Sequence, residues 1–191
     1  MGLDYHYTHS PKDVQQRVLR TQLENAVRLN KPITIHTREA EEDTERILKE
    51  IVPRDHKIHV HCFTDSPAFA KRLLDWFPNL YIGVTGVVTY SSNTNTTDVL
   101  REMVGGQGGR LRIVLETDAP YMVPSNIYES VVAMKGKRFP MSHSGMIPWT
   151  AQFVAGAIGG AGSGEVGEEE AWTADRVMVE ARENAKHLYG V

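Results

Sequence analysis

The sequence has a single cysteine, no long apolar run and no excess of basic residues. Cys62 cannot form an intramolecular disulfide, and a lone cysteine is typical of proteins in a reducing compartment. No apolar segment approaches the roughly 18 residues that a membrane span needs, and the amino terminus lacks a basic region followed by an apolar one. We therefore expect an intracellular protein, cytoplasmic or nuclear, that does not bind membranes.

The charge balance is mildly acidic, with 21 Lys and Arg against 24 Asp and Glu and a formal net charge of −3. This argues against holding nucleic acid mainly through a basic surface, because that mode depends on counterion release by many Lys and Arg. If the substrate is a phosphate ester, metal ions should supply most of the local positive potential. The composition allows a hydrophobic core, and we expect one domain over residues 1–191.

Apolar patterns of helical and strand periodicity alternate along the chain. Helices are predicted near residues 11–29 (with Ser10 as the cap), 39–51, 66–76, 97–104, 148–158 and 173–189, and strands at 33–35, 57–63, 80–84 and 111–115. This alternation implies parallel strands joined by right-handed crossovers. Residues 121–147 are predicted to form a long loop over a site, and residues 156–170 a mobile surface loop.

The strand predicted at residues 111–115 leads directly into two acids, Glu116 and Asp118. If the extended conformation continues through Thr117, both carboxylates project from one face of the sheet. An acid at the end of a buried strand is costly to desolvate unless it meets a cation, a metal or several donors. On its own the segment also fits a simpler interpretation, in which Glu116 pairs with an arginine and Asp118 caps the following turn.

Candidate metal ligands follow three of the predicted strands, namely His36, His61 and Asp118. The carboxyl ends of parallel strands lie on one side of a sheet, so these side chains should converge. Two neutral imidazoles and a carboxylate suit Zn²⁺ or Mn²⁺, and suit Mg²⁺ less well. Such an ion lowers the pKa of bound water from about 15.7 towards 7. Asp118 could bind the metal or accept the proton of that water.

Neighbouring polar residues have less specific interpretations. Arg38 could contact a substrate phosphate or form a surface salt bridge. His59 is interpreted as a hydrogen-bonded core residue, and Glu116 either supports a metal ligand or pairs within the core. The other histidines are interpreted as surface or loop residues: His6, His9, His56, His143 and His187.

Several segments resemble, in order, the TatD-related deoxyribonucleases: GLDY from Gly2, PITIHTREA from Pro32, HVHCF from His59, YIGVTGVVTY from Tyr81, LETDAPY from Leu115, and Asn184 in the last predicted helix. Residues 142–148 look like a variant found in fungal and other eukaryotic members. The resemblance implies an α/β barrel, hydrolysis of DNA phosphodiesters and divalent metal ions (Mg²⁺, Mn²⁺ or Zn²⁺), with up to two ions in complete members. It also implies His36 and His61 as ligands of one metal position and Asp118 as a ligand of the other. Asp118 is in addition our candidate catalytic residue.

The sequence departs from this family at its start. Complete members carry a His-x-His pair on the first strand and a metal-bridging glutamate two residues before the glycine of GLDY. Here that glutamate would lie one residue before Met1. We therefore expect the carboxyl-terminal half to two-thirds of a (β/α)₈ TIM barrel, with parallel strands and outer helices. An open barrel of this kind has unpaired strand edges, which favour self-association.

These observations predict a metal-dependent deoxyribonuclease that acts on DNA. Two alternatives stay open. One is a catalytically weak or inactive remnant that serves as a binding or association module. The other is a different metal-dependent barrel hydrolase, such as an amidohydrolase, which would turn over amide or lactone substrates and no oligonucleotides.

Overall fold

The fold is built on a parallel β-sheet, described by a computed structural model for residues 1–7, 9–105, 109–134, 136–159 and 171–191. The strands are β1 (Gly2–Asp4), β2 (Ile33–Arg38), β3 (Ile58–Val60), β4 (Leu80–Val84) and β5 (Ile113–Leu115). They pair in the order β1-β2-β3-β4-β5, and every neighbouring pair is parallel. Spatial order thus follows sequence order, which confirms the predicted α/β class with a parallel sheet.

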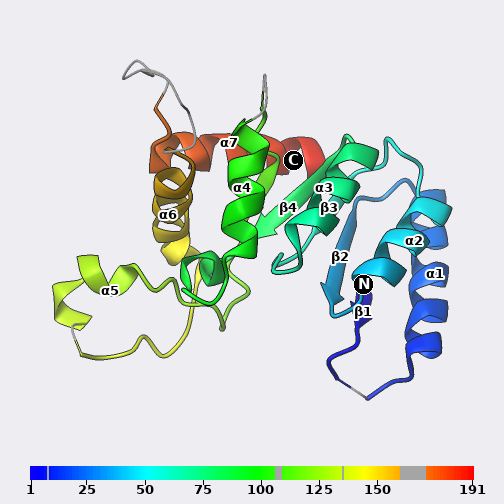
Figure 1. Ribbon diagram of the computed structural model, residues 1–191, viewed down its shortest axis with the longest axis horizontal. Helices are drawn as coiled ribbons and strands as arrows, with labels where there is room; N and C mark the ends of the chain where they lie inside the picture. The colour runs from blue at the N-terminus through cyan, green and yellow to red at the C-terminus, as the bar shows by residue number, and fades with distance from the viewer. Residues whose placement is uncertain (8, 106–108, 135, 160–170) are drawn as a thin grey trace.

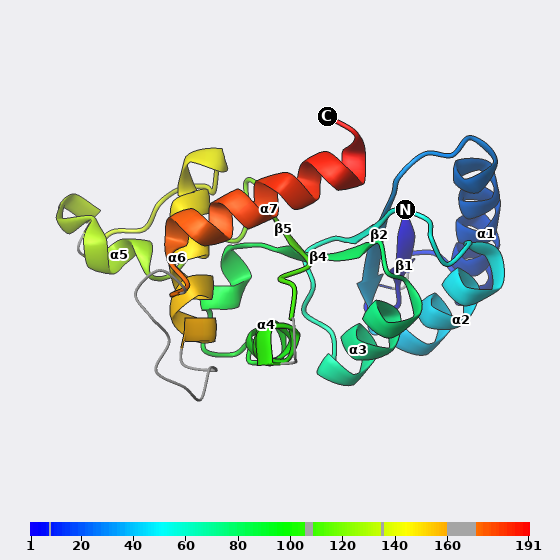
Figure 2. The same cartoon turned by 90° about the horizontal axis from the view of Figure 1, so that it is seen from above.

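The first three helices connect these strands: α1 (Lys12–Arg28), α2 (Glu41–Ile51) and α3 (Pro67–Trp76). Next come the short 3₁₀ helix η1 (Gly86–Thr89) and the helix α4 (Asn95–Gly105). Figure 2 shows α3 and α4 on one side of the sheet and α7 (Ala174–Tyr189) along the other. The core lies between the sheet and the helices, because alternate strand residues such as Ile33, Ile35 and Ile58 point there and are fully buried.

The last part of the chain contains α5 (Ile127–Ser130), the 3₁₀ helices η2 (Val132–Met134) and η3 (Ser144–Met146), and α6 (Ile147–Gly159) before α7. The described part of residues 121–147, predicted as a loop over a site, contains α5, η2 and η3 and is held to η1 and α6; its position over a site stays a prediction. The Ser125 hydroxyl donates to the Thr89 carbonyl oxygen (2.7 Å) in η1, and the Asn126 amide donates to the Trp149 carbonyl oxygen (2.9 Å) in α6. Accordingly, α5 lies far from β1 in Figure 1.

The predicted element boundaries shift by a few residues for identifiable reasons. The cap of α1 is Pro11 rather than Ser10, and no side chain caps that helix. Strand β3 ends at Val60, because Cys62 adopts a positive φ of 44° that breaks the extended conformation. Helix α4 begins two residues earlier than predicted, at Asn95. Helix α6 continues through Gly159, so the predicted loop cannot begin at Gly156; residues 160–170 lie outside the described residues.

Amide side chains satisfy backbone groups on both edge strands of the sheet. On β1 the Gln15 side chain accepts from Asp4 N–H and donates to the Asp4 carbonyl, each at 2.9 Å. Beside β5 the buried Asn184 amide donates to the carbonyl oxygens of Leu111 (2.7 Å) and Ile113 (2.9 Å). A partner strand would have to displace these side chains. Self-association through the strand edges stays a prediction.

Membrane insertion of a helix finds no support in the fold. Across the described ranges, no helix combines the length and the apolar character that crossing a bilayer requires.

Candidate metal centre

The candidate site lies where β2, β3 and β5 end, on the face of the sheet turned away from the outer helices. Along β2 the side chains of Ile35 and Thr37 are buried, whereas those of His36 and Arg38 are exposed on the opposite face. The same period of two places His59 and His61 together on one face. The shared rim of a parallel sheet therefore gathers polar side chains from separate strands, as predicted.

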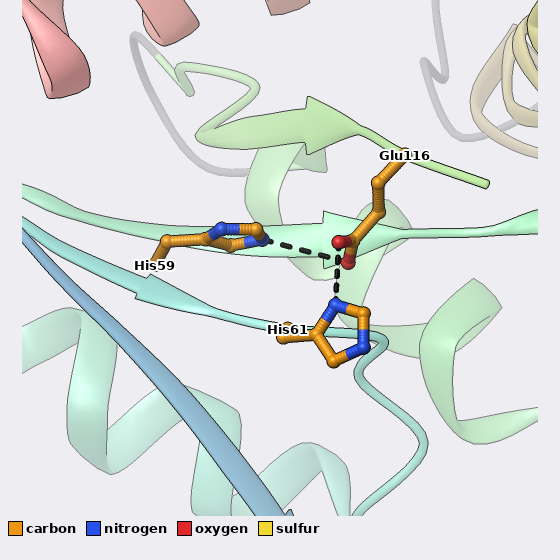
Figure 3. A group of neighbouring side chains, drawn as sticks. All are labelled: His59, His61 and Glu116. Carbon is orange, nitrogen blue, oxygen red and sulfur yellow. Dashed lines mark hydrogen bonds and ion pairs between the residues drawn. The ribbon is translucent and has the colours of Figure 1, made fainter. Parts of the chain in front are cut away.

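Glu116 pairs with histidines of β3 and the turn that follows it (Figure 3). Its Oε2 lies 2.6 Å from His61 Nδ1, and its Oε1 accepts the Cys62 N–H at 2.5 Å. His59 Nε2 lies 3.5 Å from Oε1, at the limit of hydrogen bonding. The interpretation that Glu116 pairs with an arginine is therefore wrong. The imidazole that donates to Glu116 belongs to His61, which directly follows β3 and lies 55 residues earlier in the chain.

The surroundings of Glu116 keep its carboxylate ionised. Burial by itself raises the pKa of Glu116, but its close contact with His59 and the hydrogen bonds from His61 and the Cys62 N–H outweigh burial and lower the pKa to about 2. The hydrogen bond to Glu116 in turn raises the pKa of His61 against the opposing effect of burial. An ionised carboxylate only accepts hydrogen bonds, so His61 donates from Nδ1. In the neutral imidazole the lone pair then lies on Nε2.

Asp118 lies on the other side of the His61 ring. Its Oδ1 is 3.4 Å from His61 Nε2. Two ligands held at 2.0–2.1 Å by a tetrahedral ion lie about 3.3 Å apart, so these two atoms have the spacing of adjacent metal ligands. The condition that the strand continues through Thr117 is not met, since β5 ends at Leu115; beyond it, Asp118 has a φ of 53°. This turn is what brings both carboxylates to opposite nitrogens of one imidazole.

His36 lies beside this pair, with its ring centroid 6.5 Å from that of His61. Its Nε2 is 3.3 Å from Asp4 Oδ2, and sequence reasoning missed Asp4. The pairing of Asp4 with Arg38 in the parallel register of β1 and β2 explains why Asp4 reaches this rim. Only the position of Asp4 within the short segment GLDY could have indicated it.

Within the part of the chain that the structure describes, one set of three residues has ligand atoms all within 4.8 Å: His59, His61 and Glu116. It shares only His61 with the predicted set of His36, His61 and Asp118. At 2.6 Å, His61 Nδ1 and Glu116 Oε2 are closer than adjacent metal ligands and form a hydrogen bond. We therefore favour His61 Nε2 and Asp118 Oδ1 as the metal-facing atoms, with Glu116 orienting the imidazole from behind.

The remaining sequence-based interpretations have mixed outcomes. His59 is a buried residue that hydrogen-bonds to the Tyr189 hydroxyl (2.7 Å), as predicted. His56 lies in the loop between α2 and β3, as predicted, but is buried there, with its Nε2 2.9 Å from the Lys31 carbonyl oxygen. Among the described residues, the Arg38 guanidinium forms no salt bridge, and instead lies 5.2 Å from the centroid of the Tyr7 ring. The other four histidines lie on the surface or in loops, as expected.

A second partly buried acid, Asp65, lies in the turn after β3. Burial and the neighbouring Glu41 charge raise the pKa of Asp65 to about 7, while the Thr37 hydroxyl offsets part of this effect. The folded protein then binds a proton that the unfolded chain releases above its ordinary pKa of 3.8. Stability should therefore fall between about pH 4 and pH 7 and stay reduced above pH 7.

Asp65→Asn should remove this pH-dependent loss, because the amide has no charge to desolvate. The melting temperature of the variant should exceed that of the wild type at pH 8, and the difference should shrink towards pH 4. Thermal unfolding by circular dichroism at several pH values measures it. Asp75→Asn, at an exposed position, is the matched control. A gain that is independent of pH would contradict the prediction.

Comparison with known proteins places these observations in context. The family model described as TatD related DNase matches residues 1–190. Human 3'-5' RNA nuclease TATDN2 is 46% identical over 132 residues, covering 69% of this chain and 17% of the human protein. The uncharacterized metal-dependent hydrolase YabD of Bacillus subtilis is 31% identical over 191 residues, covering 100% of this chain and 64% of YabD. This chain therefore spans less than two thirds of the length of each.

A solved structure supports the fold. The crystal structure of YJJV, a TatD homologue from Escherichia coli K12, superimposes with a TM-score of 0.70 at 24% identity. The match covers 100% of this chain and 62% of that one. At this identity the likeness concerns the fold alone.

Proposed function

The chain belongs to the TatD-related DNase family, and from this premise we propose that it carries the metal-binding rim of a hydrolase that cleaves phosphodiester bonds of DNA. The observation that carries the proposal is the separation of His61 Nε2 and Asp118 Oδ1, which lie 3.4 Å apart at the carboxyl edge of a parallel sheet, as adjacent metal ligands would. A neutral imidazole and a carboxylate together are suitable ligands for Zn²⁺ or Mn²⁺. The names of the relatives, an RNA nuclease and a metal-dependent hydrolase, agree with this chemistry.

Each residue of the rim has a proposed role. His61 and Asp118 bind the ion, and His36 supplies a second imidazole ligand. Glu116 holds the His61 ring in its orientation and keeps its proton on Nδ1. A bound divalent ion would supply a nucleophilic hydroxide near neutral pH and polarise the phosphoryl oxygen. Asp118, whose side chain is 32% exposed, could also accept the proton of the attacking water.

Arg38 is the proposed phosphate ligand. Its side chain is exposed at the end of β2, two residues beyond His36. In the described residues no hydrogen bond or ion pair holds its guanidinium; only the Tyr7 ring lies against it. The N–H donors of Arg38 are therefore available for a phosphate oxygen, and a guanidinium can bind two such oxygens at once.

The test is hydrolysis of single-stranded DNA, double-stranded DNA and RNA in Mg²⁺, Mn²⁺ or Zn²⁺. We expect cleavage of DNA that stops when EDTA is added and returns when excess metal is restored. Cleavage of RNA without cleavage of DNA would identify RNA as the substrate. Undiminished cleavage in EDTA would refute the metal-dependent mechanism, and turnover of amides or lactones without oligonucleotide cleavage would favour an amidohydrolase. If calorimetry detects no metal binding and no substrate is turned over, the remaining interpretation is a catalytically inactive association module.

A further inference from the structure

Planar side chains form an exposed column beside the candidate metal centre. The rings of Tyr7 and His9 lie 14° from parallel with centroids 5.7 Å apart. The Arg38 guanidinium carbon lies 5.2 Å from the Tyr7 centroid. We refer to these three residues, Tyr7, His9 and Arg38, as the Tyr7 platform. The Tyr7 residue is 51% exposed, so packing in the core does not account for its position.

Hydrogen bonds tie the Tyr7 platform to the candidate metal centre. Asp4 Oδ1 accepts the backbone N–H groups of His6 (3.0 Å) and Tyr7 (3.3 Å), while Asp4 Oδ2 lies 3.3 Å from His36 Nε2. Across the rim, His6 Nδ1 lies 2.7 Å from Glu39 Oε1, just beyond β2. In Figure 1 the segment after β1 leaves the sheet at the end towards which the β2 arrow points. The Asp4 carboxylate thus links the backbone of Tyr7 to His36, a predicted metal ligand.

The chemistry of the Tyr7 platform matches an unpaired nucleobase. Aromatic rings and guanidinium planes are the surfaces on which proteins stack the bases of single strands. Bases inside a duplex are already stacked on one another and cannot use such a surface. Arg38 can serve both contacts, because its guanidinium carbon lies 5.2 Å from the centroid of the Tyr7 ring and its N–H donors make no hydrogen bond or ion pair among the described residues, so a phosphate can accept from them.

We propose that the Tyr7 platform stacks a nucleobase of single-stranded nucleic acid next to the phosphodiester held at the metal centre. The proposal rests on the proposed function and deepens it, since it assigns a nucleobase subsite to named residues beside the metal centre: Tyr7 and His9, with Arg38. Base stacking tolerates any sequence, so the platform selects unpaired over paired strands and does not read the identity of the base.

The test combines a change in the protein with a change in the ligand. Fluorescence anisotropy, with EDTA present to prevent cleavage, measures binding of a short single strand and of an abasic strand of equal length and charge. Tyr7→Ala should weaken binding of the normal strand by about 5- to 150-fold, the value of one stacked base, and leave the abasic strand nearly unchanged. Tyr7→Phe should retain binding, whereas Tyr7→Leu, which keeps apolar volume without a π face, should lose most of it.

Trp76 provides the matched control, because its ring also carries cations, with the Arg54 guanidinium carbon at 4.8 Å and Lys49 Nζ at 5.0 Å. Trp76 ends α3, whose carboxyl terminus lies away from the strand ends that form the metal centre. Trp76→Ala should therefore leave binding of both strands unchanged. Circular dichroism checks that each variant is folded.

Three results would each overturn the platform. Tyr7→Ala could lose equal affinity for the normal and the abasic strand, or lose none. The wild type could also fail to bind single strands. Failure of the proposed function gives a different pattern. A wild type that binds single strands through Tyr7 but cleaves nothing with any metal refutes the hydrolase and keeps the platform. Cleavage with an unchanged KM in Tyr7→Ala refutes the platform and keeps the hydrolase.

Discussion

Asp118→Asn should lower kcat/KM for metal-dependent cleavage by at least about 100-fold and weaken metal binding to a similar extent. The amide keeps the size of the side chain but loses the negative charge at Oδ1, the atom 3.4 Å from His61 Nε2, that would attract a cation. Removal of a residue that only supports a metal ligand costs about 10- to 100-fold, and loss of a ligand should cost at least as much. Steady-state kinetics and calorimetric metal titration measure the two effects.

Asp75→Asn serves as the control for Asp118→Asn, because it removes one acid from an exposed position on α3. Its activity and metal affinity should match the wild type. If Asp118→Asn also matched the wild type in both measurements, Asp118 would be neither a ligand nor a proton acceptor. The turn interpretation of Asp118 would then be correct.

Glu116→Gln should weaken metal binding by about 10- to 100-fold through its effect on His61. Glu116 accepts from His61 Nδ1 at 2.6 Å and from the Cys62 N–H at 2.5 Å. An amide has one accepting oxygen and one donating nitrogen, so it cannot satisfy both donors. The His61 ring then loses its fixed orientation and its fixed tautomer. Metal titration of the variant, with Glu183→Gln at an exposed position as control, tests this result.

His59→Gln distinguishes the positioning role of Glu116 from direct metal binding. If the ion lay among His59, His61 and Glu116, which form the compact set, His59→Gln would remove a ligand while Asp118→Asn would have little effect. If the ion lies at His61 Nε2, the order of the two effects is reversed. Measuring both variants by the same titration therefore locates the ion on one side of the His61 ring or the other.

The strands and most helices of this protein could be predicted because their apolar residues repeat locally. Residues 80–84 were predicted as a strand and form β4 with those same bounds. The cap of α3 is also local, since the Ser66 hydroxyl accepts from Phe69 N–H three residues on. The start of α4 was missed by two residues, because the polar run before it carries no apolar period.

Convergence of His36, His61 and Asp118 on one rim was predictable because parallel strands end on the same side. The role of Glu116 was not, since its imidazole donor is 55 residues distant and pairing with an arginine fitted the local sequence equally well. Asp4 was missed for a related reason. Its contact with His36 depends on the register of β1 against β2, and a three-residue strand has no period to reveal it.

The sequence by itself determined the order of strands and helices, the edge of the sheet where the polar residues gather, and the family. Only the tertiary structure decided which nitrogen of His61 faces which carboxylate, and that Tyr7, His9 and Arg38 form a column. Periodicity in a chain reports which face of an element a side chain occupies, because backbone geometry repeats. Contacts between side chains of different elements depend on strand register and on single turns such as that at Asp118, and these are set by packing of the whole fold.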